Sequence, residues 1–134
     1  MSVKKGSKKK TKKKVREKDI ENLLLKYLNI LPSTFAWKNN STGIYDAKRG
    51  CYRKQQNKWA INGVSDILGI HNGRLLAIEV KTPSGKVTAE QQEFIERVQR
   101  EGGIAGVARS VADVRALLAE FKTREGIDDT TKSE

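Results

Sequence analysis

One stretch of the sequence decides the fold of this chain: Asp66-Ile-Leu-Gly-Ile-His-Asn-Gly-Arg-Leu-Leu-Ala-Ile-Glu-Val-Lys81. Asn72-Gly73 at its centre predicts a β-hairpin, because a type I′ turn needs positive φ at both central residues. With these two residues as the turn, counting outward places Asp66 directly opposite Glu79. Lys81 follows Glu79 by two residues, so all three side chains share one face of the predicted sheet.

The residues around these charges are almost all apolar in both predicted strands. Such a pattern is typical of a central hairpin that is covered on both faces. Two opposed carboxylates are unfavourable there unless a cation or hydrogen bonds offset their repulsion. Asp66 and Glu79, with Lys81 beside them, therefore predict a Mg²⁺ site suited to phosphodiester hydrolysis. The competing interpretation is a pair of solvated carboxylates, or a purely structural Glu79–Lys81 pair.

The other patterns predict an α/β fold, with a small mixed β-sheet flanked by helices. We expect a disordered basic arm at 1–15, one folded domain at 16–122 and a flexible tail at 123–134. Within the domain, we expect a helix from Arg16 that Pro32 ends, a strand at 34–38 and a polar loop or irregular hairpin at 39–58. Strands at 63–70 and 74–81 follow, and the capping-box pair Thr88 and Gln91 opens a second helix. A strand at 104–108 and a last helix that starts at Ser110 complete the domain.

The charge of the chain is strongly positive and unevenly distributed. The formal net charge is +11 and the pI is about 9.9, which favours a polyanionic partner. Residues 1–16 contain eight Lys, one Arg and no acid, so they carry +9 and the rest of the chain +2. No apolar run is long enough to span a membrane, and the N-terminus has no apolar region typical of a secretory signal. Cys51 is the single cysteine, so we expect no disulfide, no cysteine zinc cluster and a cytoplasmic protein.

The spacing Asp-x12-Glu-x-Lys resembles that of the PD-(D/E)xK nuclease superfamily. A longer pattern resembles its VRR-NUC branch: Asn62-Gly-Val-Ser-Asp66-Ile-Leu-Gly, then Leu-Leu-Ala-Ile-Glu79-Val-Lys81-Thr-Pro-Ser-Gly, then Thr88-Ala-Glu-Gln91-Gln-Glu-Phe94. The resemblance extends from about Arg16 to Phe121 and departs at Ser65, where this family commonly has Pro. It implies a restriction-endonuclease-like αβββαβ core and an enzyme similar to phage-type nucleases and Holliday-junction resolvases that act on branched DNA.

The resemblance also implies a role for each residue of the motif. Asp66 and Glu79 would bind Mg²⁺, or Mn²⁺ in its place, through their carboxylates, and Val80 through its backbone carbonyl. Lys81 would orient or activate the attacking water, or stabilise developing negative charge. Gln91 would lie beside the site, because it shares the inward stripe of its helix; capping alone is the competing interpretation.

The family also uses an acid on the first helix, for which Glu17 and Glu21 compete. Taking about 100° per residue, Glu17 lies about 50° and Glu21 about 90° from the centre of the apolar stripe. Helical phase therefore favours Glu17. The competing interpretation for either residue is a solvated acid that interacts with the helix dipole.

The loop at 39–58 is the predicted nucleic-acid-binding segment. Asn40 and Ser41 resemble the family's polar turn near the DNA backbone, although an ordinary polar turn is equally compatible with them. Basic residues interleaved with aromatic ones follow. The candidate contacts are Asn40, Ser41, Lys48, Arg49, Arg53 and Lys54.

These patterns together predict a Mg²⁺-dependent endodeoxyribonuclease without a small-molecule cofactor. Its size suggests a homodimer with two sites for paired cuts. RNA remains open as a substrate. The alternatives are a non-catalytic nucleic-acid-binding module with a nuclease-like fold, and a structural accessory that retained this fold.

Deleting residues 2–15 is expected to weaken DNA binding without unfolding the domain. Each phosphate that is neutralised adds about 0.9 to the slope of log K against log salt, so we expect the slope to fall by about three to six. The measurement is a salt titration of binding by the full and shortened chains. An unchanged slope would mean that the arm is a solvated tail.

Overall fold

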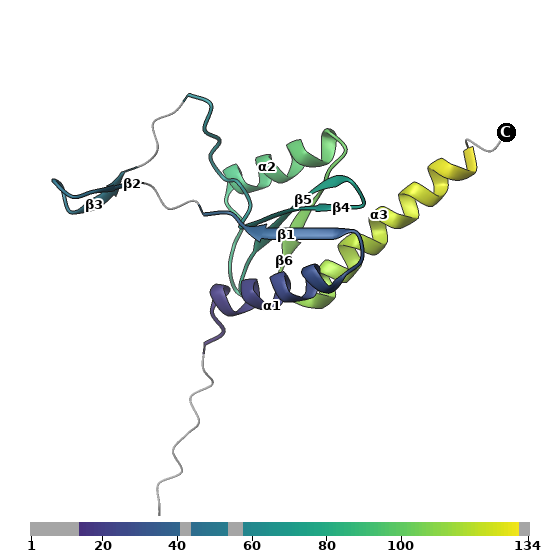
Figure 1. Ribbon diagram of the computed structural model, residues 1–134, viewed down its shortest axis with the longest axis horizontal. Coiled ribbons are helices and arrows are strands. Elements are labelled where there is room, and N and C mark those ends of the chain that lie inside the picture. Colours follow the sequence, from purple (N-terminus) through teal and green to yellow (C-terminus); the bar gives the residue numbers. More distant parts are fainter. Residues whose placement is uncertain (1–13, 41–43, 54–57, 132–134) are drawn as a thin grey trace, which may run out of the picture.

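The computed structural model describes residues 14–40, 44–53 and 58–131. Along the chain the elements are α1 (Glu17–Ile30), β1 (Thr34–Lys38), β2 (Ile44–Asp46), β3 (Cys51–Arg53), β4 (Ile67–His71), β5 (Arg74–Val80), α2 (Ala89–Arg100), β6 (Ile104–Ala108) and α3 (Val111–Thr131). Four strands form the main sheet in the order β1-β4-β5-β6, while β2 and β3 form a separate hairpin (Figure 1). The predicted small mixed sheet with helices is therefore confirmed.

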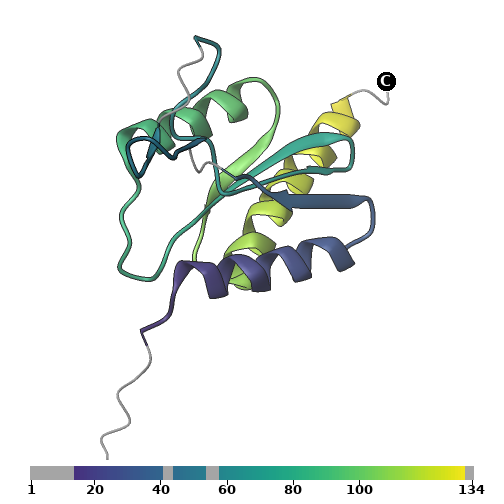
Figure 2. The ribbon, with the colours of Figure 1, turned by 60° about the vertical axis from the view of Figure 1, so that its left-hand side comes forward.

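The hairpin of β4 and β5 occupies the centre of the sheet. β1 pairs with β4 and β4 with β5 in antiparallel fashion, whereas β5 and β6 are parallel. A parallel pair needs a crossover connection, and α2 provides it. Figures 1 and 2 show α2 on one face of the sheet and α1 and α3 on the other. The central hairpin is thus covered on both faces near its open end, as its apolar sequence predicts, whereas Ile70 and Leu75 near the turn are exposed.

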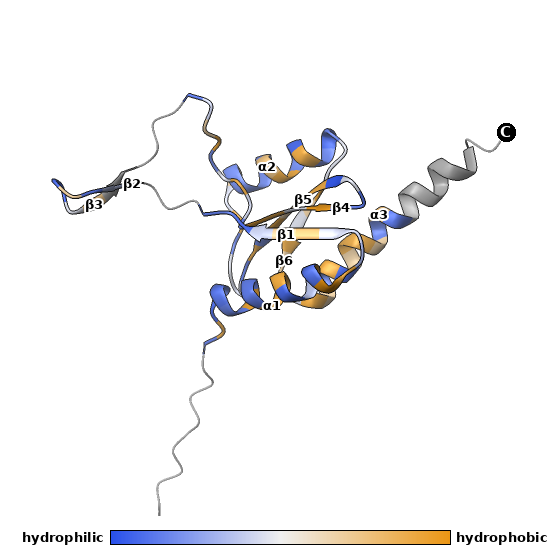
Figure 3. Cartoon of the chain, viewed as in Figure 1, coloured by the Kyte–Doolittle hydropathy of each residue, from blue (hydrophilic) through white to orange (hydrophobic). Residues whose placement is uncertain are grey.

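Two hydrophobic clusters hold these layers together. The larger cluster joins α1 and α3 to one face of the sheet and contains Ile20, Leu24, Leu28, Ala36, Ile67, Leu76, Ile78, Val80, Ile104, Ala108 and Val114. The smaller cluster lies under α2 and contains Ala77, Ile95, Val98 and Ala105. Figure 3 shows the hydrophobic colour on the central strands and the first half of α3. Burial of these side chains is the main favourable term in the folding of the domain.

Asn29, in the last turn of α1, connects this helix to β1. Its side-chain Oδ1 accepts a hydrogen bond from the Ala36 backbone N–H, and its Nδ2 donates to the Ala36 carbonyl oxygen, both at 3.0 Å. Nδ2 also donates to the Leu25 carbonyl at 2.9 Å. One amide side chain therefore satisfies both backbone groups of a strand residue and fixes the helix against that strand.

Some element boundaries differ from those expected from the sequence. β4 begins at Ile67 and not at residue 63. For the segment 39–58 we expected either a polar loop or an irregular hairpin, and the structure shows the hairpin, formed by β2 and β3. The last helix continues to Thr131, past residue 122, where we expected a flexible tail. The chain after residue 122 contains no proline, the residue that most strongly ends a helix. Among the described residues, no helix is long and apolar enough to cross a membrane.

Gly63 allows the segment before β4 to pack on the first turn of α2. Its φ is +77°, and a Cβ added there would lie 2.5 Å from the Glu90 carbonyl carbon and oxygen and 2.7 Å from the Gln91 nitrogen. These are backbone atoms within a helix, so they cannot move aside separately. The close approach thus holds the loop before β4 against the start of α2.

Gly63→Ala is therefore expected to destabilise the domain more than left-handed strain alone would. Gly73→Ala is the matched control, because Gly73 has φ +79° and open space where its Cβ would lie. We expect the control to lower the free energy of unfolding by about 1–2 kcal/mol and Gly63→Ala to cost at least about 1–2 kcal/mol more. Urea denaturation measures both. Equal losses would show that the contact with α2 is unimportant.

Candidate active site

The site lies at the end of the central hairpin, where the predicted register is confirmed. His71 pairs with Arg74 and Ile67 with Ile78, so the next residues outward, Asp66 and Glu79, are opposed. Asn72 and Gly73 have φ values of 50° and 79°, as the predicted turn requires. The same count of residues that places the turn therefore brings the two carboxyl groups together.

Asp66 is held in place by backbone hydrogen bonds on both sides. Its carboxylate Oδ2 accepts from the Val80 N–H at 2.9 Å. Its own carbonyl oxygen accepts from the Asn39 N–H at 2.7 Å, at the end of β1. Asp66 thus continues the pairing of β4 with its neighbours even though it precedes the strand, and its carboxylate is directed toward β5.

Glu79 is an almost fully buried carboxyl group, with 1% of the residue exposed. Its Oε1 accepts a hydrogen bond from Gln91 Nε2 at 2.9 Å, and Lys81 Nζ lies 3.9 Å from the same oxygen. Its Oε2 is also buried but meets no hydrogen-bond donor among the described residues. One oxygen of this carboxyl group has a hydrogen-bond donor and a nearby ammonium, whereas the other has no donor, which is unfavourable for a buried oxygen.

The surroundings raise the pKa of Glu79 from an ordinary value of 4.5 to about 8. Burial is the largest cause, followed by the hydrogen bond that the protonated Glu79 carboxyl group donates to Asp66 and by the Asp66 charge, whereas the positive charge of Lys81 acts in the opposite direction. The protein therefore favours the neutral form of Glu79 near pH 7. A bound cation would reverse this preference, because it would stabilise both carboxylates.

The residues present fit a divalent cation of the Mg²⁺ type. The unpartnered Glu79 Oε2 and the close Asp66 carboxyl provide hard oxygen donors, as Mg²⁺ prefers. No three His, Cys, Asp or Glu side chains gather anywhere in residues 14–40, 44–53 and 58–131. A cation here would therefore be held by two carboxylates, with the Val80 carbonyl as the candidate third ligand. Few protein ligands, with water or substrate oxygens in the remaining positions, are usual for Mg²⁺.

Gln91 has both roles that the sequence left open. Its side-chain Oε1 accepts from the Thr88 N–H at 3.0 Å, and the Thr88 hydroxyl accepts from the Gln91 N–H at 3.2 Å. This reciprocal pair is the predicted capping box of α2. The amide nitrogen of the same side chain donates to Glu79. The start of α2 is therefore tied directly to the carboxyl group.

Arg109 is a contributor to the site that sequence reasoning missed. It follows β6, and its guanidinium donates to the carbonyls of Thr82 and Gly85, the latter at 2.8 Å. These carbonyls belong to the turn that directly follows Lys81, which is closed by a hydrogen bond from the Gly85 N–H to the Thr82 carbonyl. Arg109 thus fixes the backbone that carries the lysine. Its position just after a buried strand was the available signal.

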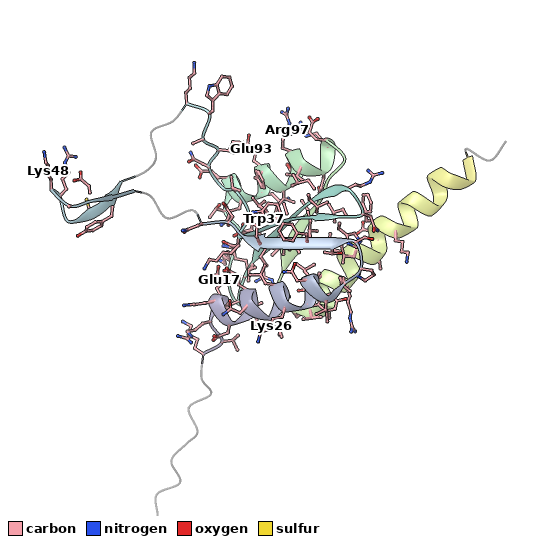
Figure 4. The ribbon with its side chains drawn as sticks, in the orientation of Figure 1. Glu17, Lys26, Trp37, Lys48, Glu93 and Arg97 are labelled. Atoms are coloured by element: carbon pink, nitrogen blue, oxygen red, sulfur yellow. The ribbon has the colours of Figure 1, made fainter. Side chains whose placement is uncertain are left out.

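The structure places the two acids of α1 differently from what their helical phase predicts. Glu21 is buried, at 7% exposed, and its Oε1 lies 3.3 Å from Lys38 Nζ on β1, whereas Glu17 is exposed. The apolar stripe thus buries Glu21, because β1 packs against this turn of the helix. Glu17, at the start of α1 (Figure 4), lies close enough for its charge to raise the pKa of Glu79. Glu17 is therefore near the site although its side chain is exposed.

Two of the predicted nucleic-acid contacts, Lys48 and Arg49, lie apart from the acids. Lys48 and Arg49 are exposed in the turn between β2 and β3, and Figure 4 shows Lys48 at the end of the hairpin, away from the main sheet. Asn40 is exposed just after β1. Arg53 lies in β3, but its side chain is outside the described set, as are residues Ser41 and Lys54 and the lysine arm at 1–13.

Comparison with known proteins places this arrangement in a family. The model of the VRR-NUC domain matches residues 14–112, most of the chain. The chain belongs to the VRR-NUC domain family. A solved structure described as a VRR_NUC domain protein is similar in fold, with a TM-score of 0.57 and 19% identity over 81% of this chain and 89% of that one. No curated protein matches this chain.

Membership of the VRR-NUC family confirms the resemblance found in the sequence and gives this chain a nuclease-like fold. The matched segment contains Asp66, Glu79, Lys81 and Gln91, the residues that the structure brings together. Their catalytic roles remain predictions from the motif and the geometry.

The raised pKa of Glu79 predicts how the stability of the metal-free protein depends on pH. Between about pH 4.5 and 8 the folded state holds a proton that the unfolded state releases, so the free energy of unfolding should fall as pH rises through this range. Each pKa unit corresponds to about 1.4 kcal/mol, so a loss on the order of a few kcal/mol is expected. Chemical denaturation at several pH values with a chelator present measures it.

Glu79→Gln removes the titrating group and keeps the size of the side chain, so most of this pH dependence should disappear. Glu93→Gln is the control, since Glu93 is an exposed acid on α2, and it should keep the wild-type profile. A wild-type profile in Glu79→Gln would contradict the assignment.

Proposed function

We propose that this VRR-NUC chain is a metal-dependent endonuclease that hydrolyses DNA phosphodiester bonds. One observation carries the proposal. A buried Glu79 carboxyl group, one oxygen of which meets no hydrogen-bond donor, lies against Asp66 and beside Lys81 and the amide of Gln91. A structural role does not account for this group, since two adjacent acids in a largely apolar sheet oppose folding. A cation bound to the unpartnered oxygen of Glu79, with a phosphate oxygen as a further ligand, accounts for all four residues.

Each residue has a distinct task in this proposal. Asp66, Glu79 and the Val80 carbonyl hold Mg²⁺ or Mn²⁺, which when bound polarises the scissile phosphate and lowers the pKa of a water molecule. Gln91 keeps Glu79 in one orientation through its donated hydrogen bond. Lys81, just before the turn that Arg109 fixes, places its ammonium near the reacting phosphate, where it stabilises negative charge or orients the water. Glu17 adds a carboxylate at the edge of the site.

The substrate and assembly are proposed on separate grounds. Net positive charge and exposed Lys48 and Arg49 favour a nucleic acid. Branched or junction DNA is the substrate that the family resemblance suggests. A homodimer with two sites would suit paired cuts in such DNA, because one protomer of 134 residues is small beside a four-way junction.

Incubation with duplex, flap and four-way-junction DNA, with Mg²⁺, with Mn²⁺ and with a chelator, tests the activity. We expect cleavage that requires the metal. Asp66→Asn and Glu79→Gln should each lower the single-turnover rate at least about 100-fold, since such electrostatic interactions contribute factors of about 10²–10³. Lys81→Ala should lower the rate similarly but keep the calorimetric affinity for metal.

Glu93→Gln again serves as the control and should cleave at the wild-type rate. Wild-type rates in Asp66→Asn and Glu79→Gln would refute the metal site. DNA binding without cleavage by the wild-type protein, under every metal condition, would favour the non-catalytic binding module.

A further inference from the structure

The face of the sheet that carries the acids also carries a group of exposed apolar side chains. The pairing of strands arranges this face in rows. One row contains Asp66 and Glu79, the next contains Trp37, Leu68 and Ala77, and the third contains Phe35, Ile70 and Leu75. Rows on one face are two residues apart, or roughly 7 Å along the strands. Trp37 is therefore one row from the acids, and Phe35 two.

Only part of this face is covered by α2. The helix packs on β5 and β6, and the smaller core cluster ends at Leu68. The rings on β1 are left open: Phe35 is 64% and Trp37 40% exposed, with ring centroids 5.4 Å apart. Ile70 and Leu75, beside Phe35, are also exposed. Figure 4 shows Trp37 standing on β1 on the side toward α2. We call Phe35, Trp37, Ile70 and Leu75 the aromatic platform.

We propose that the aromatic platform binds unpaired bases of a nucleic-acid strand, by stacking them on Phe35 and Trp37 beside Asp66 and Glu79. Its relation to cleavage rests on the proposed nuclease function, whereas the binding of bases does not. The platform would then select DNA whose bases are unpaired next to the scissile phosphate. In an intact duplex the base faces are covered by their neighbours, so they cannot stack on a protein ring.

Charge and continuity favour a nucleic-acid strand over a second copy of the chain. The platform is continuous with the candidate site through the row of Trp37 and Leu68. β1 leads directly into the segment that carries exposed Lys48, Arg49 and Lys58. The net charge of +11 attracts the phosphates of a nucleic-acid strand, and it gives a second copy of the chain no such attraction.

Fluorescence and binding measurements with a single-stranded thymidine oligonucleotide test this proposal. A chelator is present, so that no cleavage occurs. The chain has two tryptophans, so a Trp59→Phe background makes Trp37 the reporter. We expect the oligonucleotide to quench its fluorescence. Anisotropy of labelled single-stranded and duplex DNA of equal length then gives both affinities.

Phe35→Leu and Trp37→Leu each remove a ring and keep an apolar side chain. Each should reduce single-strand affinity about tenfold more than duplex affinity, as expected for the loss of one stacked base. Trp37→Phe keeps a ring and should restore most of the affinity, which excludes misfolding as the cause. Leu23→Ala is the control, because Leu23 is an exposed apolar residue of α1, on the other side of the sheet from the platform, and it should preserve the ratio of the two affinities.

Three results would overturn the proposal. The first is an unchanged affinity ratio in both leucine variants. The second is an equal change in Leu23→Ala. The third is a wild-type dimer, measured by sedimentation, that dissociates in Trp37→Leu, because the platform would then be an interface between copies. Strand discrimination without cleavage would refute only the nuclease function, and cleavage without ring-dependent discrimination would refute only the platform.

Discussion

The opposition of Asp66 and Glu79 across the central hairpin is the constraint on which the rest of the structure depends. The Asn72–Gly73 turn sets this register, and a shift of one residue would move Glu79 to the face covered by α1 and α3. The hydrogen bond from the Val80 N–H to the Asp66 carboxylate fixes the register at the other end of the hairpin. The same pairing thus determines both the core and the site.

Placing a carboxyl group in this position opposes the stability of the domain. Glu79 is buried as deeply as the leucines of the core, yet one of its oxygens meets no donor among the described residues. Neighbouring segments limit the resulting cost: α2 supplies the Gln91 amide, Lys81 follows β5 directly, and Arg109 holds the turn after Lys81. A helix, the end of a strand and a turn therefore converge on one end of the sheet, around a carboxyl group whose burial packing alone does not favour.

Local signals predicted much of this arrangement because their physical causes are local. The Asn-Gly turn fixed the strand pairing, and the Thr88–Gln91 spacing fixed the start of α2. Contacts between distant segments were beyond such reasoning. Arg109 is 27 residues from the Thr82 carbonyl that it binds, and Gly63 meets the backbone of α2. The burial of Glu21 depends on where β1 crosses α1, and the phase of one helix contains no information about its neighbour.

The amide of Asn29 has a consequence for association between molecules. β1 is an outer strand of the sheet, and such a strand presents unpaired backbone groups with which another polypeptide can form hydrogen bonds. The Asn29 side chain occupies the N–H and the carbonyl of Ala36, in the middle of this strand, in the manner of an adjoining strand. A single residue of α1 thus discourages edge-to-edge aggregation and the addition of a foreign strand at β1, while the broad face of the same strand stays open.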